Sequence, residues 1–487
     1  MHSIRANNAE NIQTDAVSIG AGGAGLAAAV AAAEKGAKVI VLEKLSKPGG
    51  NTARAQGFFA AESSTQKRNN IVAPRDVLFK MAMDYAHWKI NPRIMRTLID
   101  KSVDTVDWLE QKGMPQVNQI WPLFPGQEIP TMHYPEKGGA GVIETLINSC
   151  NKMGVRVMYH SQAKKITTTP GGAVSGVLAT NNKNEIKIKA KCAIIATGGY
   201  GGNKEMLKKY CPAYIEGTHS PGLPHKGDGL LMATEAGAAT EGLGMLMWLG
   251  PVYEGIEQGP GIWKEPDLVW VNNKGERFVD ESVGLNHFES VNAVLRQPDR
   301  VSYSLFDEQV KCNMVQKIES GQVRFRGLSH SRRTSGQADF TTELQLEAEK
   351  GRTKISESWD AIAQWMGADP EVLKSTVEEY NDCCYHGYDK IFGKDRKFLL
   401  PLTTPPYYAM RCRAMFLATI GGIKINHNME VLDSRDNPIP GLYAGGNDTG
   451  GWEPDTYNAF LSSHAMGFAI NSGRIAGENA AQFLARK

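Results

Sequence analysis

The stretch that decides the fold is Asp15-Ala16-Val17-Ser18-Ile19-Gly20-Ala21-Gly22-Gly23-Ala24-Gly25. Its apolar run predicts a short buried strand, and its glycines form a Gly-x-Gly-x-x-Gly turn. An alanine-rich segment then runs to Lys35, which predicts a helix that Gly36 ends. A second apolar run, 39–42, follows and leads into Glu43. The sequence therefore predicts a strand–turn–helix–strand unit that ends in an acid.

Each part of this unit suits a dinucleotide. Gly20 allows the tight turn, Gly22 lets the backbone approach a diphosphate, and Gly25 lets the helix pack on the strand. The free N–H groups and the positive dipole at the start of the helix favour phosphates. Glu43 lies about 20 residues further on, where a carboxylate can accept hydrogen bonds from ribose hydroxyls. We therefore expect a Rossmann-like dinucleotide-binding domain.

Further glycine clusters indicate that the dinucleotide is FAD rather than NAD. Thr197-Gly198-Gly199 follows the apolar run 193–196, and Gly445-Gly446-Asn447 follows the strand-like run 441–444. Gly49-Gly50-Asn51-Thr52, just past Glu43, is a backbone-rich loop that can lie against a flat ring. An NAD domain usually keeps its contacts within one contiguous segment. Clusters spread along the chain favour one long cofactor that is touched at several points.

These motifs together resemble the flavoprotein family of fumarate reductase, succinate dehydrogenase and the 3-ketosteroid dehydrogenases. The resemblance implies hydride exchange between flavin N5 and a substrate carbon, with proton transfer at the neighbouring carbon. It does not fix the substrate, because one fold serves many reactions. The matching segments follow the family order along the chain and are 20–25, 49–52, Ala196-Thr197-Gly198-Gly199, Gly227-Asp228-Gly229, 272–281, Thr419-Ile420-Gly421-Gly422 and 441–446.

The expected fold class is α/β, with a Rossmann-like FAD-binding domain that carries an inserted α+β capping domain for the substrate. A chain of 487 residues is too long for a single core. We place the FAD-binding domain at 1–241 and 401–487 and the cap at 242–400. Helical periodicity fills 75–112, with breaks near Pro92 and Gly113. A last helix is expected from Asn458 to Leu484, and residues 1–14 are expected to be a loose tail rather than a signal peptide.

Composition limits the functional classes. A net charge of +2 gives no reason to expect nucleic acid or an anionic membrane surface as a partner. The seven cysteines are odd in number and scattered, which argues against a disulfide framework. They include no Cys-x-x-Cys pair, which argues against an iron–sulfur cluster or a c-type haem. No metal site is expected. No transmembrane segment is expected either, because the alanine-rich run 24–33 is too short to cross a bilayer. A cytoplasmic enzyme with a small-molecule substrate is the prediction.

The predicted cofactor-binding residues lie in the first turn, in the loop after Glu43 and at strand ends further along the chain. The region around Gly57 has no histidine suited to covalent attachment, so the FAD is expected to be noncovalent. The predicted residues are Gly20, Gly22, Gly23, Ala24, Gly25, Glu43, Lys44, Gly49, Gly50, Asn51, Thr52, Gly57, Ala163, Ala196, Thr197, Gly198, Asn203, Asp228, Gly446, Asn447 and Ser463.

The chain departs from the dicarboxylate pattern of the family that it resembles. Fumarate reductases carry histidines where this chain has Leu417 and Ala418, and the family's proton-donating arginine would fall near Leu285. The segment after Gly451 also lacks the family's histidine and arginine. Each charge-assisted hydrogen bond to a carboxylate is worth roughly 1.5–3 kcal/mol. Fumarate and succinate are therefore disfavoured, and a cyclic ketone, a ketosteroid or an aryl-acrylate is expected.

Two residues are candidates for the proton-transfer step. Tyr457 lies in a segment that resembles the 4-ene type of 3-ketosteroid dehydrogenase, and a phenol can donate a proton or polarise a carbonyl. His287 lies close to the expected position of the family's proton donor. Arg411 and Arg413 share one face of a predicted strand, where they meet either a substrate anion or solvent. The remaining predicted substrate residues are Leu417, Gly421 and Trp452.

Other side chains are weaker candidates. His133, Tyr134 and His464 carry titratable groups without a motif of their own. Several aromatic residues could supply apolar area around the cleft, although a single aromatic residue is usually part of a core. They are Trp248, Tyr253, Trp263, Trp270, Phe288, Phe416, Trp452 and Tyr457.

Three alternatives stay open on the sequence. The chain could be a dicarboxylate reductase with rearranged basic residues, or an FAD-dependent amine or hydroxy-group oxidase. It could also be a non-catalytic electron-transfer subunit, in which case the cap would lack a proton donor. Neither the direction of the reaction nor the external electron donor or acceptor follows from the sequence.

Overall fold

A computed structural model describes residues 10–182, 184–216, 218, 220, 224–254, 261–322 and 339–486. Its contacts divide the chain into two compact units. The first comprises Met1–Glu216, Gly222–Met247 and Ala418–Lys487, and the second comprises Trp248–Leu417 with Gly217–Pro221. The second unit is thus inserted into the first. Strand β17 (Tyr407–Thr419) pairs along most of its length with a strand of the second unit, which explains why the boundary lies at Leu417 rather than near 400.

The first unit is built on a six-stranded sheet in the order β19-β20-β11-β2-β3-β7. All neighbouring pairs are parallel except β19 with β20. The bounds are β2 (Ala16–Ile19), β3 (Val39–Leu42), β7 (Arg156–Met158), β11 (Cys192–Ile195), β19 (Glu430–Leu432) and β20 (Pro438–Ala444). Strands β2, β3 and β11 are buried at every residue, as expected for strands covered on both faces. Because β2, β11 and β20 are adjacent and parallel, the glycine turns that follow them lie at one edge.

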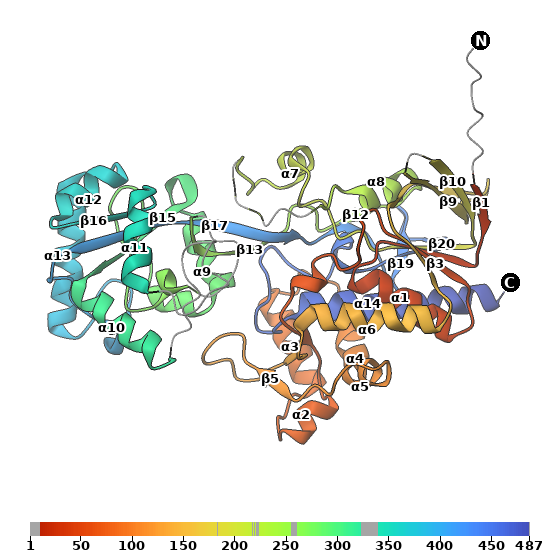
Figure 1. The fold of residues 1–487 in the computed structure, drawn as a ribbon, viewed down its shortest axis with the longest axis horizontal. Helices are drawn as coiled ribbons and strands as arrows, with labels where there is room; N and C mark the ends of the chain where they lie inside the picture. Colours follow the sequence, from red (N-terminus) through yellow and green to blue (C-terminus); the bar gives the residue numbers. More distant parts are fainter. Residues whose placement is uncertain are drawn as a thin grey trace, which may run out of the picture. The chain divides into compact units, whose positions relative to one another are not determined.

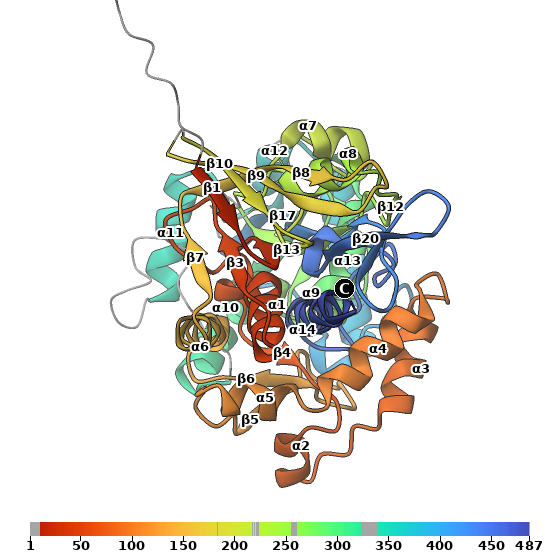
Figure 2. The same ribbon diagram turned by 90° about the vertical axis from the view of Figure 1, so that its right-hand side faces the viewer.

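Helix α1 (Gly23–Glu34) lies between α6 (Gly138–Lys152) and α14 (His464–Ala485), as Figures 1 and 2 show. Small residues allow the close approach of α14 to α1. A Cβ atom added at Gly473 would lie 2.2 Å from the Ala24 carbonyl oxygen, and one added at Gly477 would lie 2.2 Å from that of Ala28. The last helix therefore packs almost backbone to backbone on the helix that follows the first glycine turn.

A four-stranded sheet in the order β1-β10-β9-β8 forms a second layer of this unit. Its strands are β1 (Glu10–Gln13), β8 (Ser161–Thr168), β9 (Val174–Asn181) and β10 (Asn184–Lys189). Strand β1 pairs in parallel with β10, so the prediction of a loose tail is wrong for 10–13. Backbone hydrogen bonds hold this polar edge strand in the sheet. Because these bonds do not depend on apolar side chains, the sequence of the strand shows no apolar pattern. Residues 1–9 lie outside the described residues.

The predicted helical breaks in 75–112 are confirmed. Asn91 caps α4 (Pro92–Ser102) by accepting a hydrogen bond from the Arg93 N–H at 3.0 Å. The last helix begins at His464 rather than Asn458. The other elements of this unit are β4 (Phe58–Phe59), α2 (Ser64–Arg68), α3 (Arg75–Tyr85), α4 (Pro92–Ser102), α5 (Thr105–Gln111), β5 (Gln119–Trp121), β6 (Met132–Tyr134), α7 (Lys204–Tyr210), α8 (Asp228–Glu235), β12 (Thr240–Glu241) and β18 (Gly422–Ile423).

The second unit holds a sheet in the order β13-β17-β15-β14, with β16 also paired to β17. Its strands are β13 (Leu246–Tyr253), β14 (Val269–Val271), β15 (Val301–Asp307) and β16 (Thr353–Ser356). Its helices are α9 (His287–Leu295), α10 (Glu308–Glu319), α11 (Phe340–Glu349), α12 (Trp359–Met366) and α13 (Pro370–His386). The mixture of an antiparallel sheet and helices agrees with the expected α+β cap.

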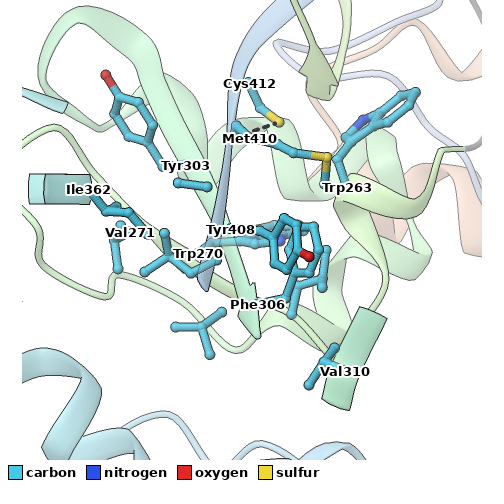
Figure 3. Packing of buried hydrophobic residues seen from close by; sticks show 14 of the residues in the cluster. Trp263, Trp270, Val271, Tyr303, Phe306, Val310, Ile362, Tyr408, Met410 and Cys412 are labelled. Carbon is cyan, nitrogen blue, oxygen red and sulfur yellow. Dashed lines mark hydrogen bonds between the residues drawn. The ribbon is translucent and has the colours of Figure 1, made fainter. Parts of the chain in front are cut away.

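Aromatic residues fill the hydrophobic core of the second unit (Figure 3). Phe306 and Tyr408 stack with their rings 4.8 Å apart and nearly parallel. Three of the aromatic residues expected around the cleft, Tyr253, Trp263 and Trp270, belong to this core and are almost fully buried. They are packing residues of the unit.

Buried charges fix the segment 272–281, one of the segments that carried the family resemblance. Arg277 forms ion pairs with Glu281 and Asp389, each at 2.8 Å, and Lys394 lies 3.1 Å from Glu281. Hydrogen bonds and opposite charges hold the pKa of the buried Glu281 below its usual range. Arg277 and Glu281 therefore have a structural role, because their buried charges are compensated within the unit.

Candidate active site

The first glycine turn is shaped as a cradle. Gly20 has a left-handed φ of 108°, and a Cβ atom there would lie 2.3 Å from the Ala196 carbonyl oxygen. A Cβ atom at Gly25 would lie 1.9 Å from the Gly20 oxygen, so both positions require glycine. At Gly22, the residue that precedes α1, the nearest atom to an added Cβ is the Gly49 oxygen at 4.0 Å. The turn is thus closed on its protein side and open at Gly22, as diphosphate binding requires.

Glu43 is bound to the turn itself. Its carboxylate accepts hydrogen bonds from the N–H groups of Ala21 at 2.9 Å and Leu45 at 2.8 Å. Each carboxylate oxygen keeps a further lone pair that could face a ribose hydroxyl. Glu43 therefore joins the turn after β2 to the end of β3.

The loop after Glu43 folds back on the turn. The Gly49 N–H donates to the Ala21 oxygen at 2.9 Å, and the Thr52 hydroxyl accepts from the Gly23 N–H at 3.2 Å. Asn51 lies between them, and its Oδ1 atom is buried and accepts no hydrogen bond from any described group. A buried acceptor without a donor is costly in a protein, so it fits a site that a cofactor completes.

Asp448, which was not predicted, joins the second and third glycine turns. Its buried carboxylate accepts hydrogen bonds from the N–H groups of Gly198 and Gly199, each at 2.9 Å, and it also bonds Thr197 through the backbone N–H and the hydroxyl. Burial raises the pKa of Asp448, while these donors favour the charged form. The sequence signal was the acid that directly follows Gly446-Asn447.

His225 is a second orphaned polar group near these turns. It is buried, its Nδ1 atom bonds no described residue, and its Nε2 atom lies 2.9 Å from the position of an added Cβ at Gly198. Burial and the nearby cations Lys44 and Arg54 lower the pKa of His225 to about 4, so the ring is neutral at pH 7. No motif marked this residue in the sequence.

All the predicted cofactor residues belong to the first unit, and their local roles differ. Lys44 forms an ion pair with Asp228 at 2.7 Å. Asn203 caps α7 by accepting from the Met206 N–H at 3.2 Å, and Ser463 precedes α14 with a left-handed φ of 60°. Ala163 lies in β8, next to a bulge in its pairing with β9. The cradle, the orphaned Asn51 and His225 atoms and the joined glycine turns together fit FAD.

Tyr457 lies in a buried cluster of polar and aromatic side chains in the first unit. Its ring stacks on that of His464, with centroids 4.6 Å apart and an angle of 22° between the planes. Its hydroxyl oxygen accepts a hydrogen bond from the Ala465 N–H at 3.4 Å. Burial, with a contribution from Glu453, raises the pKa of Tyr457 well above its usual range. The phenol is therefore neutral and keeps its proton at neutral pH.

Glu453 and His464 contact each other beside Tyr457. His464 Nδ1 lies 2.9 Å from the Leu461 carbonyl oxygen, which can only accept, so Nδ1 carries a proton. The other ring nitrogen, Nε2, directly contacts a carboxylate oxygen of Glu453, and both side chains are almost fully buried. Burial raises the pKa of Glu453, and the neighbouring His464 opposes this rise. His464, a weaker candidate in the sequence, is thus the residue whose ring stacks on that of Tyr457.

His287 lies in the second unit, at the first position of α9. Its Nδ1 atom is 3.4 Å from the Nζ atom of Lys264. Burial and the charge of Lys264 lower the pKa of His287 well below its ordinary value, so the ring is neutral. Lys264 had no place among the predicted residues, because it is distant in sequence and belongs to no motif.

The predicted substrate residues have varied settings. Arg411 and Arg413 both contact Glu254, which Arg413 meets at 3.2 Å. Leu417 packs against the core of the second unit. Trp452 is fully buried, stacks on Phe468 and donates to the Thr449 oxygen at 2.9 Å. Gly421 has a left-handed φ of 116°, and an added Cβ there would lie 2.0 Å from the Gly242 oxygen.

No group of histidine, cysteine or acidic side chains in the described part could hold a metal ion. No helix within the described ranges is both long and apolar enough to cross a membrane.

Comparisons with known proteins agree with this geometry. The family described as FAD binding domain matches residues 15–458. The vinyl phenol reductase of Lactiplantibacillus plantarum is 33% identical over 489 residues, which cover 96% of each chain. A flavocytochrome c3 fumarate reductase in its open conformation has a TM-score of 0.75 and 27% identity, over 97% of this chain and 79% of that one.

The 3-ketosteroid-Δ4-(5α)-dehydrogenase of Rhodococcus jostii RHA1 also has a TM-score of 0.75, over 98% of this chain and 99% of that one. Its identity of 24% makes this a likeness of fold. The predicted fold class, cofactor and family are confirmed. The chain belongs to the FAD binding domain family and is an FAD-dependent oxidoreductase that acts on C=C or CH–CH bonds.

Proposed function

We propose that this enzyme reduces the C=C bond of a conjugated aryl alkene, with a hydroxyaryl alkene as the first choice and a cyclic enone or ketosteroid as the second. The relative of similar length that acts on a vinyl phenol supports this choice. So does the absence of basic residues at Leu285, Leu417 and Ala418, since a dicarboxylate needs cationic partners. An aryl substrate can instead be bound by apolar contacts.

The neutral phenol of Tyr457, set in its buried cluster, is the observation that carries the proposed chemistry. Bound FAD supplies the hydride-transfer chemistry. Tyr457 holds the proton for the neighbouring carbon at its hydroxyl oxygen, and its raised pKa keeps that proton in place at neutral pH. The stacked His464 ring fixes the plane of the phenol. Reduction of an alkene needs both the hydride and this proton.

The proposal includes a noncovalent FAD and a cytoplasmic enzyme that receives electrons from an external carrier. The structure places His133 beside Gly57, where an added Cβ atom would lie 2.3 Å from the His133 carbonyl oxygen. Both of its ring nitrogens are bonded, one to the Ser63 hydroxyl at 2.7 Å and one to the Thr131 carbonyl at 2.9 Å. Burial lowers the pKa of His133 to about 4. These bonds give it a structural role and leave it poorly suited to covalent attachment.

The fumarate alternative has less support. Arg411 and Arg413 are the basic residues among the predicted substrate residues, and Glu254 already forms ion pairs with both. A substrate carboxylate would have to compete with that side chain. Electron-transfer subunits without catalysis and amine oxidases are not proposed, because the relatives act on carbon–carbon bonds.

The test is an anaerobic screen in which the reduced holoenzyme is mixed with alkenes and reoxidation of its flavin is followed by absorbance. We expect 4-vinylphenol or an aryl-acrylate to reoxidise the flavin at least tenfold faster than fumarate. Fast reoxidation by fumarate, with slow reaction of every aryl alkene and enone, would overturn the proposal.

A further inference from the structure

His225 is held against the second glycine turn by the backbone around it. Its carbonyl oxygen accepts a hydrogen bond from the Gly202 N–H at 2.8 Å, and the Gly227 N–H donates to the Gly199 oxygen at 3.1 Å. Its ring packs on Gly198, where three ring atoms lie 2.9–3.1 Å from the position of an added Cβ atom. The fold therefore fixes the place of this ring, and Gly198 must lack a side chain to admit it.

The same ring carries a polar atom that has no partner within the protein. His225 is only 6% exposed, and its Nδ1 atom is buried and bonds no described group. Burial, with smaller contributions from Lys44 and Arg54, lowers the pKa of His225 to about 4, so the neutral ring holds one proton. A buried ring nitrogen without a partner is costly. A polar group that enters the site on binding would remove this cost.

The glycine turn under His225 lies against the turn that forms the cradle. An added Cβ atom at Gly20 would lie 2.3 Å from the Ala196 oxygen and 3.4 Å from the Cα atom of Thr197, the residue before Gly198. The two turns follow the neighbouring parallel strands β2 and β11. His225 therefore borders the turn next to the cradle, and all of these residues belong to the first unit.

The charges around His225 favour an anion as its partner. Lys44 and Arg54 both act on its ring as positive charges. Asp228 is the opposing acid, and its carboxylate already forms an ion pair with Lys44 at 2.7 Å. Lys44 directly follows Glu43, whose carboxylate is bound to the first turn. A phosphate oxygen, which can only accept hydrogen bonds, suits an N–H donor in such a positive environment.

We propose that His225 is a further cofactor-binding residue, which donates a hydrogen bond from Nδ1 to a diphosphate oxygen of bound FAD. The neutral ring then carries its single proton on Nδ1, because the diphosphate oxygen has no proton to donate. This role concerns the cofactor alone and is independent of the substrate and of Tyr457. Its test therefore measures release of FAD and needs no turnover.

The experiment follows FAD leaving the full-length holoenzyme. A dilution series, read by the fluorescence of free flavin, gives the dissociation constant of FAD. His225→Leu removes the donor and keeps apolar bulk, so the dissociation constant should rise about 10- to 100-fold, as expected when a hydrogen bond to a charged group is lost. His225→Asn keeps an amide N–H donor near the position of Nδ1 and should restore most of the affinity.

A control variant and the flavin itself give further readouts. His427→Leu removes a half-buried histidine of the same unit and should leave the affinity for FAD unchanged. Far-UV circular dichroism is recorded for each variant. The flavin absorbance maxima and reduction potential should be the same in all of them, because the contact lies on the diphosphate rather than on the isoalloxazine ring.

Displacement of FAD by ADP and by adenosine locates the contact. In His225→Leu, the inhibition constant of ADP should rise together with the dissociation constant of FAD. That of adenosine, which has no phosphate, should stay as in the wild type.

Four results would overturn the proposal. The first is an unchanged affinity for FAD in His225→Leu. The second is an equal loss in His225→Asn, which would give the ring a packing role only. The third is an altered flavin spectrum with unchanged ADP binding, which would put the ring beside the isoalloxazine. The fourth is an equal loss for ADP and adenosine, which would put the contact on the nucleoside.

Discussion

At the scale of single residues, we expect proton transfer from the Tyr457 hydroxyl to limit the rate of the reaction. Tyr457→Phe keeps the ring that stacks on His464, so the FAD content and the fold should be preserved. The rate of flavin reoxidation by substrate should fall roughly 10²- to 10⁴-fold, the range expected for a lost general acid. Apparent substrate affinity should change much less, because the interaction is strongest in the transition state. Single-turnover kinetics measure the rate directly.

The pH profile and a second variant test this assignment. A raised pKa in an acid means that the protonated form persists to higher pH, so ionisation of Tyr457 should cause no fall in rate up to about pH 10. His287→Gln is the matched change in the second unit. A normal rate in Tyr457→Phe together with a collapsed rate in His287→Gln would move the proton-transfer role to His287.

The glycine turn before α1 is the decisive feature at the scale of elements. Gly22 has extended backbone angles, φ −84° and ψ −174°, that any residue can adopt. Gly22→Val should therefore fold, while its side chain occupies the open side of the cradle and prevents diphosphate binding. We expect protein that is purified without yellow colour. Gly171→Val, in an exposed turn without left-handed φ, is the control and should keep its flavin.

The elements that were predicted correctly carry their own local signals. Strand β2, the turn and α1 are marked by an apolar run and three glycines, and α4 is marked by Asn91-Pro92. The misses have no such signal. Strand β1 is polar and is held by its pairing with β10, and α14 starts at His464, directly after Ser463 with its left-handed backbone.

Long-range contacts explain what the sequence could not predict of the site. Lys264 meets His287, Asp448 meets Gly198, and Glu453 meets His464 across separations that no spacing rule relates. Tertiary packing also decides which aromatic residues are core, as Trp263 and Trp270 show. The glycine turns were predictable because a glycine marks each tight turn or close backbone approach in the sequence itself, whereas buried acid–base pairs depend on the completed fold.

The division into two units leads to a prediction for the whole molecule. The second unit has its own hydrophobic core, and all the predicted cofactor residues lie in the first. A noncovalent FAD should therefore stabilise the first unit, by about 2.7 kcal/mol at a free concentration one hundred times the dissociation constant. Scanning calorimetry of the full chain should show two unfolding transitions. Added FAD should raise the transition temperature of the first unit by several degrees and that of the second unit by less.

Gly22→Val should lose the FAD-dependent shift and keep both transitions. Uniform movement of a single transition would show that the units unfold together, and flavin retained after acid precipitation would show that it is covalently bound.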